Sequence, residues 1–184
     1  MNVILDIVGS VILAGLIILA MNNGVAELNE TTYEQTYSLT QQTNIVALAR
    51  IIEHDFVKIG YRAPDSAIVE ADSQSITFRS DLYNDDTLRT VTYTLCTPEG
   101  EPVSEVANPA EMVLFREVTG ETPAAISSGL VEFSLTYFDS TGRATSSADE
   151  VHAIAVRVEL QTPEPVDEGY PAVFWEKTIY PRNL

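Results

Sequence analysis

Residues 3–21 read VILDIVGSVILAGLIILAM, and this stretch decides which class of fold the chain can adopt. Its only charged residue is Asp6 and its only hydroxyl belongs to Ser10. A helix rises about 1.5 Å per residue, so this one spans about 28 Å, close to the hydrocarbon thickness of a bilayer. A cleaved signal peptide has a basic start and a small-residue cleavage site, and a core helix is seldom apolar on every face. The stretch therefore predicts a membrane-spanning helix.

The helix is expected to continue far beyond this apolar stretch. Residues 22–44 are rich in Thr, Gln, Asn and Glu and contain no proline. Apolar side chains then recur every three or four positions, at Ile45, Leu48, Ile52, Phe56 and Ile59. This spacing places them on one face of a helix, and Gly60 suits the cap that ends it. We expect one helix over about residues 3–59, with its last turns packed on the C-terminal domain.

After Pro64 the period of the apolar residues changes to two, which is typical of strands with one buried and one wet face. Turn-forming sequences such as TPEG, TGE and DSTG separate the alternating segments. The expected strands cover residues 76–78, 91–95, 112–118, 131–137, 154–160 and 172–180. The predicted fold class is α+β, in which a long N-terminal helix packs on a small antiparallel β-sheet domain.

Three parts of the chain follow from these patterns. Residues 1–24 form the transmembrane half of the helix and residues 25–60 its amphipathic half, while residues 61–184 form the β-rich globular domain. With 27 acidic and 10 basic residues the net charge is −17, which opposes binding to nucleic acid. The first basic residue is Arg50. The short N-terminal tail and the large acidic remainder favour an N-terminus in the cytoplasm and a C-terminal domain outside it.

The residue types that carry catalysis are sparse. Cys96 is the only cysteine, and its alternating surroundings predict a small buried side chain. His54 and His152 are the only histidines, too few and too far apart in sequence for a zinc site. No nucleophile or phosphate-binding motif is found, so we expect no catalytic residue, no cofactor and no metal.

One loop is rich in oxygen ligands. Asp81, Asn84, Asp85 and Asp86 lie close together, and calcium takes six to eight oxygens from loops of this kind. The spacing of an EF-hand is absent, however. We interpret residues 81–86 as a solvated turn and leave calcium binding as the alternative.

Small residues in the apolar helix are candidates for helix–helix contact. Ser10 and Ala14 are four apart, as are Ala20 and Gly24. Small side chains at this spacing let two helices approach closely in lipid. The alternative is that they belong to an ordinary lipid-facing surface.

Together these features resemble the type IV pilin-like superfamily. The apolar helix with one acidic residue near its start, the amphipathic continuation and the antiparallel strands are all part of the resemblance. Residues 51–64, IIEHDFVKIGYRAP, look like the helix end of minor pilins of the W class and of type II secretion pseudopilins of the J class. The segments SITFRSDL, VTYTL, LFREV, VEFSLTYFD and PRNL also look like that group. The acidic residue here is an aspartate, Asp6, where the family usually has glutamate.

The resemblance implies a structural subunit, minor or at the tip of a pilus-like or pseudopilus-like filament, that catalyses no reaction. Such a subunit waits as a single-pass protein of the inner membrane and is then extracted into a periplasmic or extracellular filament. Its implied partners are the lipid bilayer, the inner-membrane assembly machinery and other pilin-like subunits, through their N-terminal helices. Asp6 would pair with the free α-amino group of a neighbouring subunit, unless it lies close enough to the cytoplasmic face to reach water without a partner. The alternative is a membrane-tethered binding or scaffold module of another envelope complex.

Overall fold

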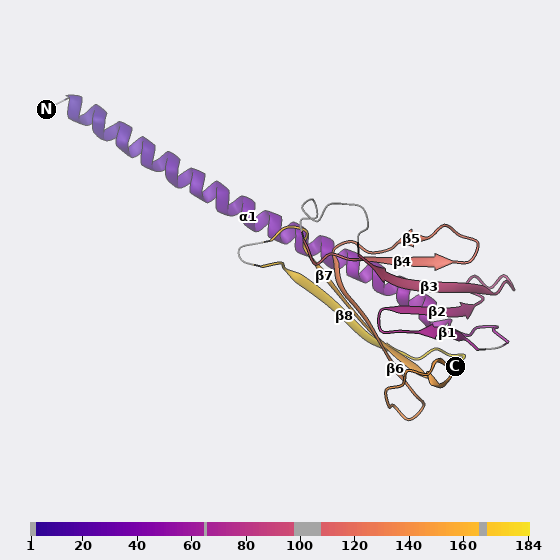
Figure 1. The fold of residues 1–184 in the computed structure, drawn as a ribbon. Helices are drawn as coiled ribbons and strands as arrows, with labels where there is room; N and C mark the ends of the chain where they lie inside the picture. The colour runs from indigo at the N-terminus through magenta and orange to yellow at the C-terminus, as the bar shows by residue number, and fades with distance from the viewer. Residues whose placement is uncertain (1–2, 65, 98–107, 166–168) are drawn as a thin grey trace. The chain divides into compact units, whose positions relative to one another are not determined.

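A computed structural model describes residues 3–64, 66–97, 108–165 and 169–184, apart from the side chains of residues 4–6, 26, 29, 30 and 34 (Figure 1). A single helix, α1, runs over Val3–Val57 and agrees with the predicted long helix. The chain divides into two compact units, Met1–Leu39 and Thr40–Leu184. The boundary falls within α1, so the last turns of this helix belong to the same unit as the strands.

The strands of the second unit form two antiparallel sheets where one was predicted. The first has the order β1-β2-β3-β4-β5 and the second the order β6-β7-β8. Their bounds are β1 Ile68–Ala71, β2 Ser75–Ser80, β3 Arg89–Cys96, β4 Val113–Val118, β5 Ala124–Ala125, β6 Leu130–Phe138, β7 Ala153–Gln161 and β8 Ala172–Ile179. The six predicted strands are confirmed, whereas β1 and β5 were not predicted because each is too short for alternation to be recognised.

The helix ends at Val57, two residues before the predicted end, and Gly60 follows in the turn. Gly60 has a φ of 77°, a left-handed conformation that favours glycine. A Cβ atom there would lie 2.9 Å from both the Ala67 Cβ and the Asn183 carbonyl oxygen. The Gly60 N–H donates to the Arg79 carbonyl, at 3.0 Å. Gly60 therefore turns the chain away from α1 at a point where neither backbone conformation nor space admits a side chain.

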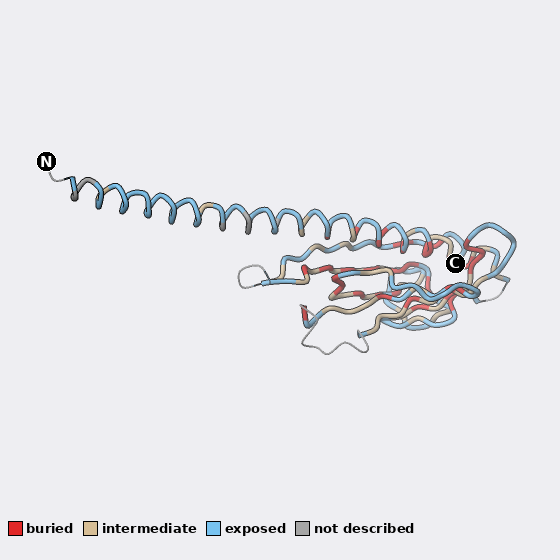
Figure 2. The backbone as a smooth tube through the Cα atoms, turned by 90° about the horizontal axis from the view of Figure 1, so that it is seen from above, coloured by how far each residue is buried: buried red, intermediate tan, exposed pale blue. Residues whose placement is uncertain are grey.

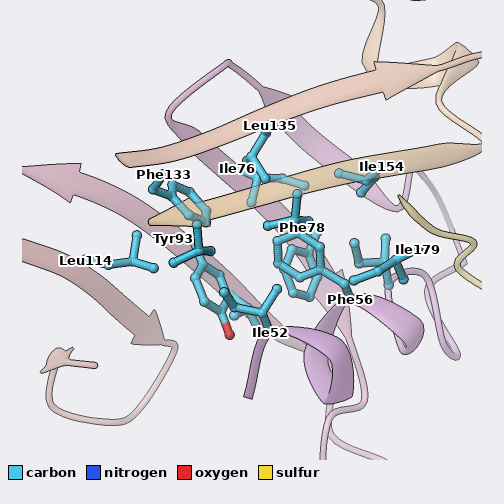
Figure 3. Packing of buried hydrophobic residues seen from close by; sticks show 14 of the residues in the cluster. Ile52, Phe56, Ile76, Phe78, Tyr93, Leu114, Phe133, Leu135, Ile154 and Ile179 are labelled. Carbon is cyan, nitrogen blue, oxygen red and sulfur yellow. The ribbon is translucent and has the colours of Figure 1, made fainter. Parts of the chain in front are cut away.

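The amphipathic end of α1 supplies one wall of the core. All five apolar residues predicted to share a face are buried: Ile45, Leu48, Ile52, Phe56 and Ile59. The Phe56 ring meets those of Phe78 and Tyr93 edge-on, with centroids 5.9 and 5.4 Å apart (Figure 3). Both sheets contribute to the same apolar cluster, and Figure 3 shows Leu135 and Ile154 of the second sheet beside these rings.

Two adjacent isoleucines of α1 test this packing directly. Ile52 is 0% exposed and Ile51 is 37% exposed, so the two differ in burial but not in chemistry. We expect Ile52→Ala to lower the free energy of unfolding by about 2–5 kcal/mol, because it removes buried methyl groups and leaves a cavity. Ile51→Ala, the matched control, should cost much less. Urea unfolding of both variants measures the difference, and equal losses would contradict the assigned helix face.

Candidate functional site: the unburied apolar segment of α1

The apolar segment of α1 is not covered by the chain to which it belongs. The stretch Ile7–Val25 is long and apolar enough to cross a membrane, and none of it is buried. Its large apolar residues are between 52% and 66% exposed (Figure 2). Soluble proteins rarely leave so many neighbouring apolar residues open to water, because each one gains about 1.5–3 kcal/mol on burial. The segment therefore has the length and composition of a membrane span.

The four small residues that the sequence singles out lie on this uncovered segment. Ala14 and Ala20 are exposed, and no atom lies within 4 Å of a Cβ built on Gly24. At about 100° per residue, Ser10, Ala14, Ala20 and Gly24 fall within about 120° of the helix circumference. Leu13 and Ile17 share that arc. The small residues therefore form two separate notches, Ser10–Ala14 and Ala20–Gly24, instead of one continuous groove.

The hydroxyl of Ser10 is satisfied inside its own helix. Its Oγ donates to the Ile7 carbonyl at 2.8 Å. Such a bond removes most of the cost of placing a hydroxyl in an apolar medium. Ser10 can therefore face lipid or a neighbouring helix equally well, and the choice between these roles stays a prediction.

Asp6 lies on α1 immediately before the segment that can cross a membrane, which begins at Ile7. Asp6 precedes Gly24 by eighteen residues, which is about five full helical turns. The two residues therefore lie on the same side of a regular helix. The Asp6 side chain is outside the described residues. Its pairing with a neighbouring subunit therefore stays a prediction.

The residues considered for metal binding are placed in several parts of the second unit. Within the described residues no group of three or more His, Cys, Asp or Glu side chains could hold a metal ion. His54 lies on α1, where its Nδ1 is 3.0 Å from Asp55 Oδ1, and His152 immediately precedes β7. Cys96, at the end of β3, is half-buried instead of buried as predicted.

The oxygen-rich loop over residues 81–86 is held by protein donors. Asn84, Asp85 and Asp86 are exposed, which agrees with the predicted solvated turn, but Asp81 is buried. The Asp81 carboxylate accepts the N–H groups of Asp85 and Asp86, each at 3.1 Å. Arg62 Nη1 lies 3.0 Å from the same carboxylate and also contacts Asp86. The hydrogen bond from Arg89 lowers the pKa of Asp85 below its ordinary value. The burial of Asp81 follows from its role in closing this loop.

A buried carboxylate that the sequence did not single out joins α1 to the first sheet. Asp55 Oδ2 accepts hydrogen bonds from the Tyr93 hydroxyl and from Arg116 Nε, both at 2.6 Å. Burial raises the pKa of Tyr93 well above its ordinary value, and the Asp55 charge adds to the effect. Burial alone would lower the pKa of Arg116, but the hydrogen bond and charge of Asp55 outweigh it and raise this pKa. These two hydrogen bonds join the last turns of α1 to β3 and β4.

Sequence patterns contain a signal for this pair. Asp55 lies three residues after Ile52 and one before Phe56, and thus on the face predicted to be buried. Arg116 alternates with Leu114 and Val118, the two buried residues of β4. A charged residue at an inward position on each of two elements predicts an ion pair between them. Counting apolar residues alone misses it.

The chain matches no protein-family model and no curated protein.

Removing the Asp55 carboxylate should destabilise the second unit strongly. We expect Asp55→Ala to lower the free energy of unfolding by about 3–5 kcal/mol, because it leaves the Arg116 guanidinium, whose side chain is only 16% exposed, without the carboxylate 2.6 Å from its Nε. Glu53→Ala is the matched control on the same helix. It breaks the 2.9 Å ion pair with Lys177, whose side chains are 36% and 49% exposed, and such pairs contribute about 1 kcal/mol or less. Thermal unfolding compares the two, and a loss no larger for Asp55→Ala would contradict the assigned role.

Proposed function

We propose that this chain is a structural subunit of a pilus-like or pseudopilus-like filament, anchored in the inner membrane through α1 before assembly. The observation that carries the proposal is that none of Ile7–Val25 is buried, on a helix whose last turns belong to the core. One element thus joins a surface that needs an external apolar partner to a folded β-rich unit. Lipid provides that partner before assembly, and the apolar helices of neighbouring subunits provide it afterwards.

The notches on α1 support the second of these environments. Helices in lipid gain little from apolar burial alone, and close approach at small residues drives their association. Ser10–Ala14 and Ala20–Gly24 offer two places for such an approach, about ten residues or 15 Å apart along the helix. The β-rich unit has its own core and remains outside the membrane, on the side away from the cytoplasm. In this account the chain performs no reaction, and its partners are other pilin-like subunits and the inner-membrane assembly machinery.

Asp6 is the residue with the most specific role in the proposal. A carboxylate inside a bilayer costs about 2.5–3.5 kcal/mol at the centre and less near the edge, where Asp6 lies. No basic residue precedes Arg50, so the first 49 residues hold no cationic side chain that could pair with it. The α-amino group of a neighbouring subunit is the cation that assembly would bring to it.

The test compares incorporation of Asp6 variants into sheared filaments, identified by immunolabelling in negative stain. Asp6→Ala should insert into the membrane as well as the parent, or better, but its filament-bound fraction should fall by about tenfold or more. Truncating one partner of a buried charge pair costs about 2–5 kcal/mol. Asp6→Glu should largely retain incorporation. Glu27→Gln, a change at an exposed carboxylate of α1 outside the predicted transmembrane half, is the matched control.

Two outcomes count against the proposal at different levels. Efficient incorporation of Asp6→Ala would mean that α1 assembles by packing alone, without the charge pair. Absence of the parent chain from every filament, with the protein confined to membranes, would instead support a membrane-tethered binding or scaffold module.

A further inference from the structure

A hollow of about 250 Å³ lies at the C-terminal end of α1, where the helix, the loop over residues 81–86 and the end of the chain meet. Its lining consists of Val57, Lys58, Tyr61, Asn84, Arg182 and Asn183. Within the described part of the chain, none of the lining residues is acidic and five of the six carry a side-chain hydrogen-bond donor. This composition is unusual for a chain with 27 acidic and only 10 basic residues.

The two cations of this hollow hold no carboxylate. Five other basic residues form ion pairs: Arg62, Arg89, Arg116, Arg157 and Lys177. In the described residues Lys58 and Arg182 form none, and the same holds for Arg50, Arg79 and Arg143. Lys58 Nζ donates to the Leu82 carbonyl at 2.6 Å, which leaves two of its three hydrogens for another acceptor.

The walls of the hollow are tied to one another. The Arg182 N–H donates to the Val57 carbonyl at 3.5 Å, and Asn183 Nδ2 donates to the Ile59 carbonyl at 3.3 Å. The hydrogen bond from Lys58 to the Leu82 carbonyl joins the end of the helix to the loop. Within the loop, the Asp81 carboxylate accepts the N–H groups of Asp85 and Asp86, so that Asn84 lies inside a closed turn. These contacts hold the end of the chain beside the end of α1 (Figure 1). Because these hydrogen bonds already hold the lining residues in place, binding a ligand costs little further conformational entropy.

We propose that this hollow is a binding site for a small hydroxylated organic carboxylate, of the sugar-acid type. Lys58 and Arg182 receive the carboxylate, because charge-assisted hydrogen bonds to ammonium and guanidinium groups are the strong ones. Asn84 and Asn183 form hydrogen bonds with the hydroxyl groups of the ligand, since a side-chain amide both donates and accepts. Val57 and the Tyr61 ring contact the carbon skeleton. The volume lies below the range of about 300–1,000 Å³ that drug-sized ligands need, which restricts the ligand to about one ring. The site does not depend on the proposed filament role.

The test is titration of the isotope-labelled full chain, in detergent micelles, with D-glucuronate, followed by two-dimensional NMR. We expect shifts in the side-chain amides of Asn84 and Asn183 and in the backbone amides of Lys58 and Tyr61. D-glucose, which has the same ring without the carboxylate, should shift none of them. Inorganic phosphate at equal concentration should act more weakly, because it cannot use Val57 and Tyr61.

Arg182→Gln supplies the decisive variant. It should weaken glucuronate binding by about tenfold or more, the usual effect of losing a charged hydrogen bond. Arg143→Gln, which neutralises another exposed arginine that forms no ion pair in the described residues, should leave binding unchanged. Equal shifts with phosphate would overturn the organic class of ligand. Absence of any glucuronate-induced NMR shift at any concentration would overturn the site. If Arg182→Gln also lowered the thermal stability, Lys58 and Arg182 would be assigned a structural role, stabilising the negative C-terminal end of the α1 dipole.

Discussion

The last turns of α1 pack against strands of both sheets. The fold of the β-rich unit and its attachment to the rest of the chain both depend on this contact. Ile52 and Phe56 supply its apolar part, and Asp55 supplies a buried carboxylate whose Oδ2 accepts hydrogen bonds from Arg116 and Tyr93. A buried ion pair is weak evidence for stability, because desolvation offsets its attraction. Its geometry is demanding, however. It therefore fixes the rotation of α1 about its axis, which apolar packing alone would leave less precisely defined.

The two ends of α1 differ in burial. Ile45, Leu48, Ile52 and Phe56 lie in the apolar core, whereas none of Ile7–Val25 is buried. One helix thus carries a buried face after Leu39 and, before it, a segment long and apolar enough to cross a membrane. This division of roles is the physical basis of the proposed anchored subunit.

Much of the fold could be predicted because periodicity reports which residues are buried. The spacing of residues 45–59 predicted the buried face of α1, and alternation predicted six strands. Periodicity does not report which strands pair, so the separation into two sheets was not predictable. The bulge between Ile68 and Glu70 and the two-residue length of β5 concealed the remaining strands. In the candidate site, Asp6 and the small residues could be recognised because the residues around them are apolar. Asp55 and Arg116 could not, because a charged residue is expected to be exposed until its buried partner is known.

The central claim is that the uncovered segment of α1 is held by a bilayer when no partner subunit is present. The most direct measurement is expression of the full chain alone, separation of membranes, an alkaline carbonate wash and intact-mass analysis of each fraction. The account predicts that the chain stays in the washed membranes with residues 3–25 still attached. Recovery in the soluble fraction, shortened at its N-terminus by the apolar segment, would contradict it and identify that segment as a cleaved signal peptide.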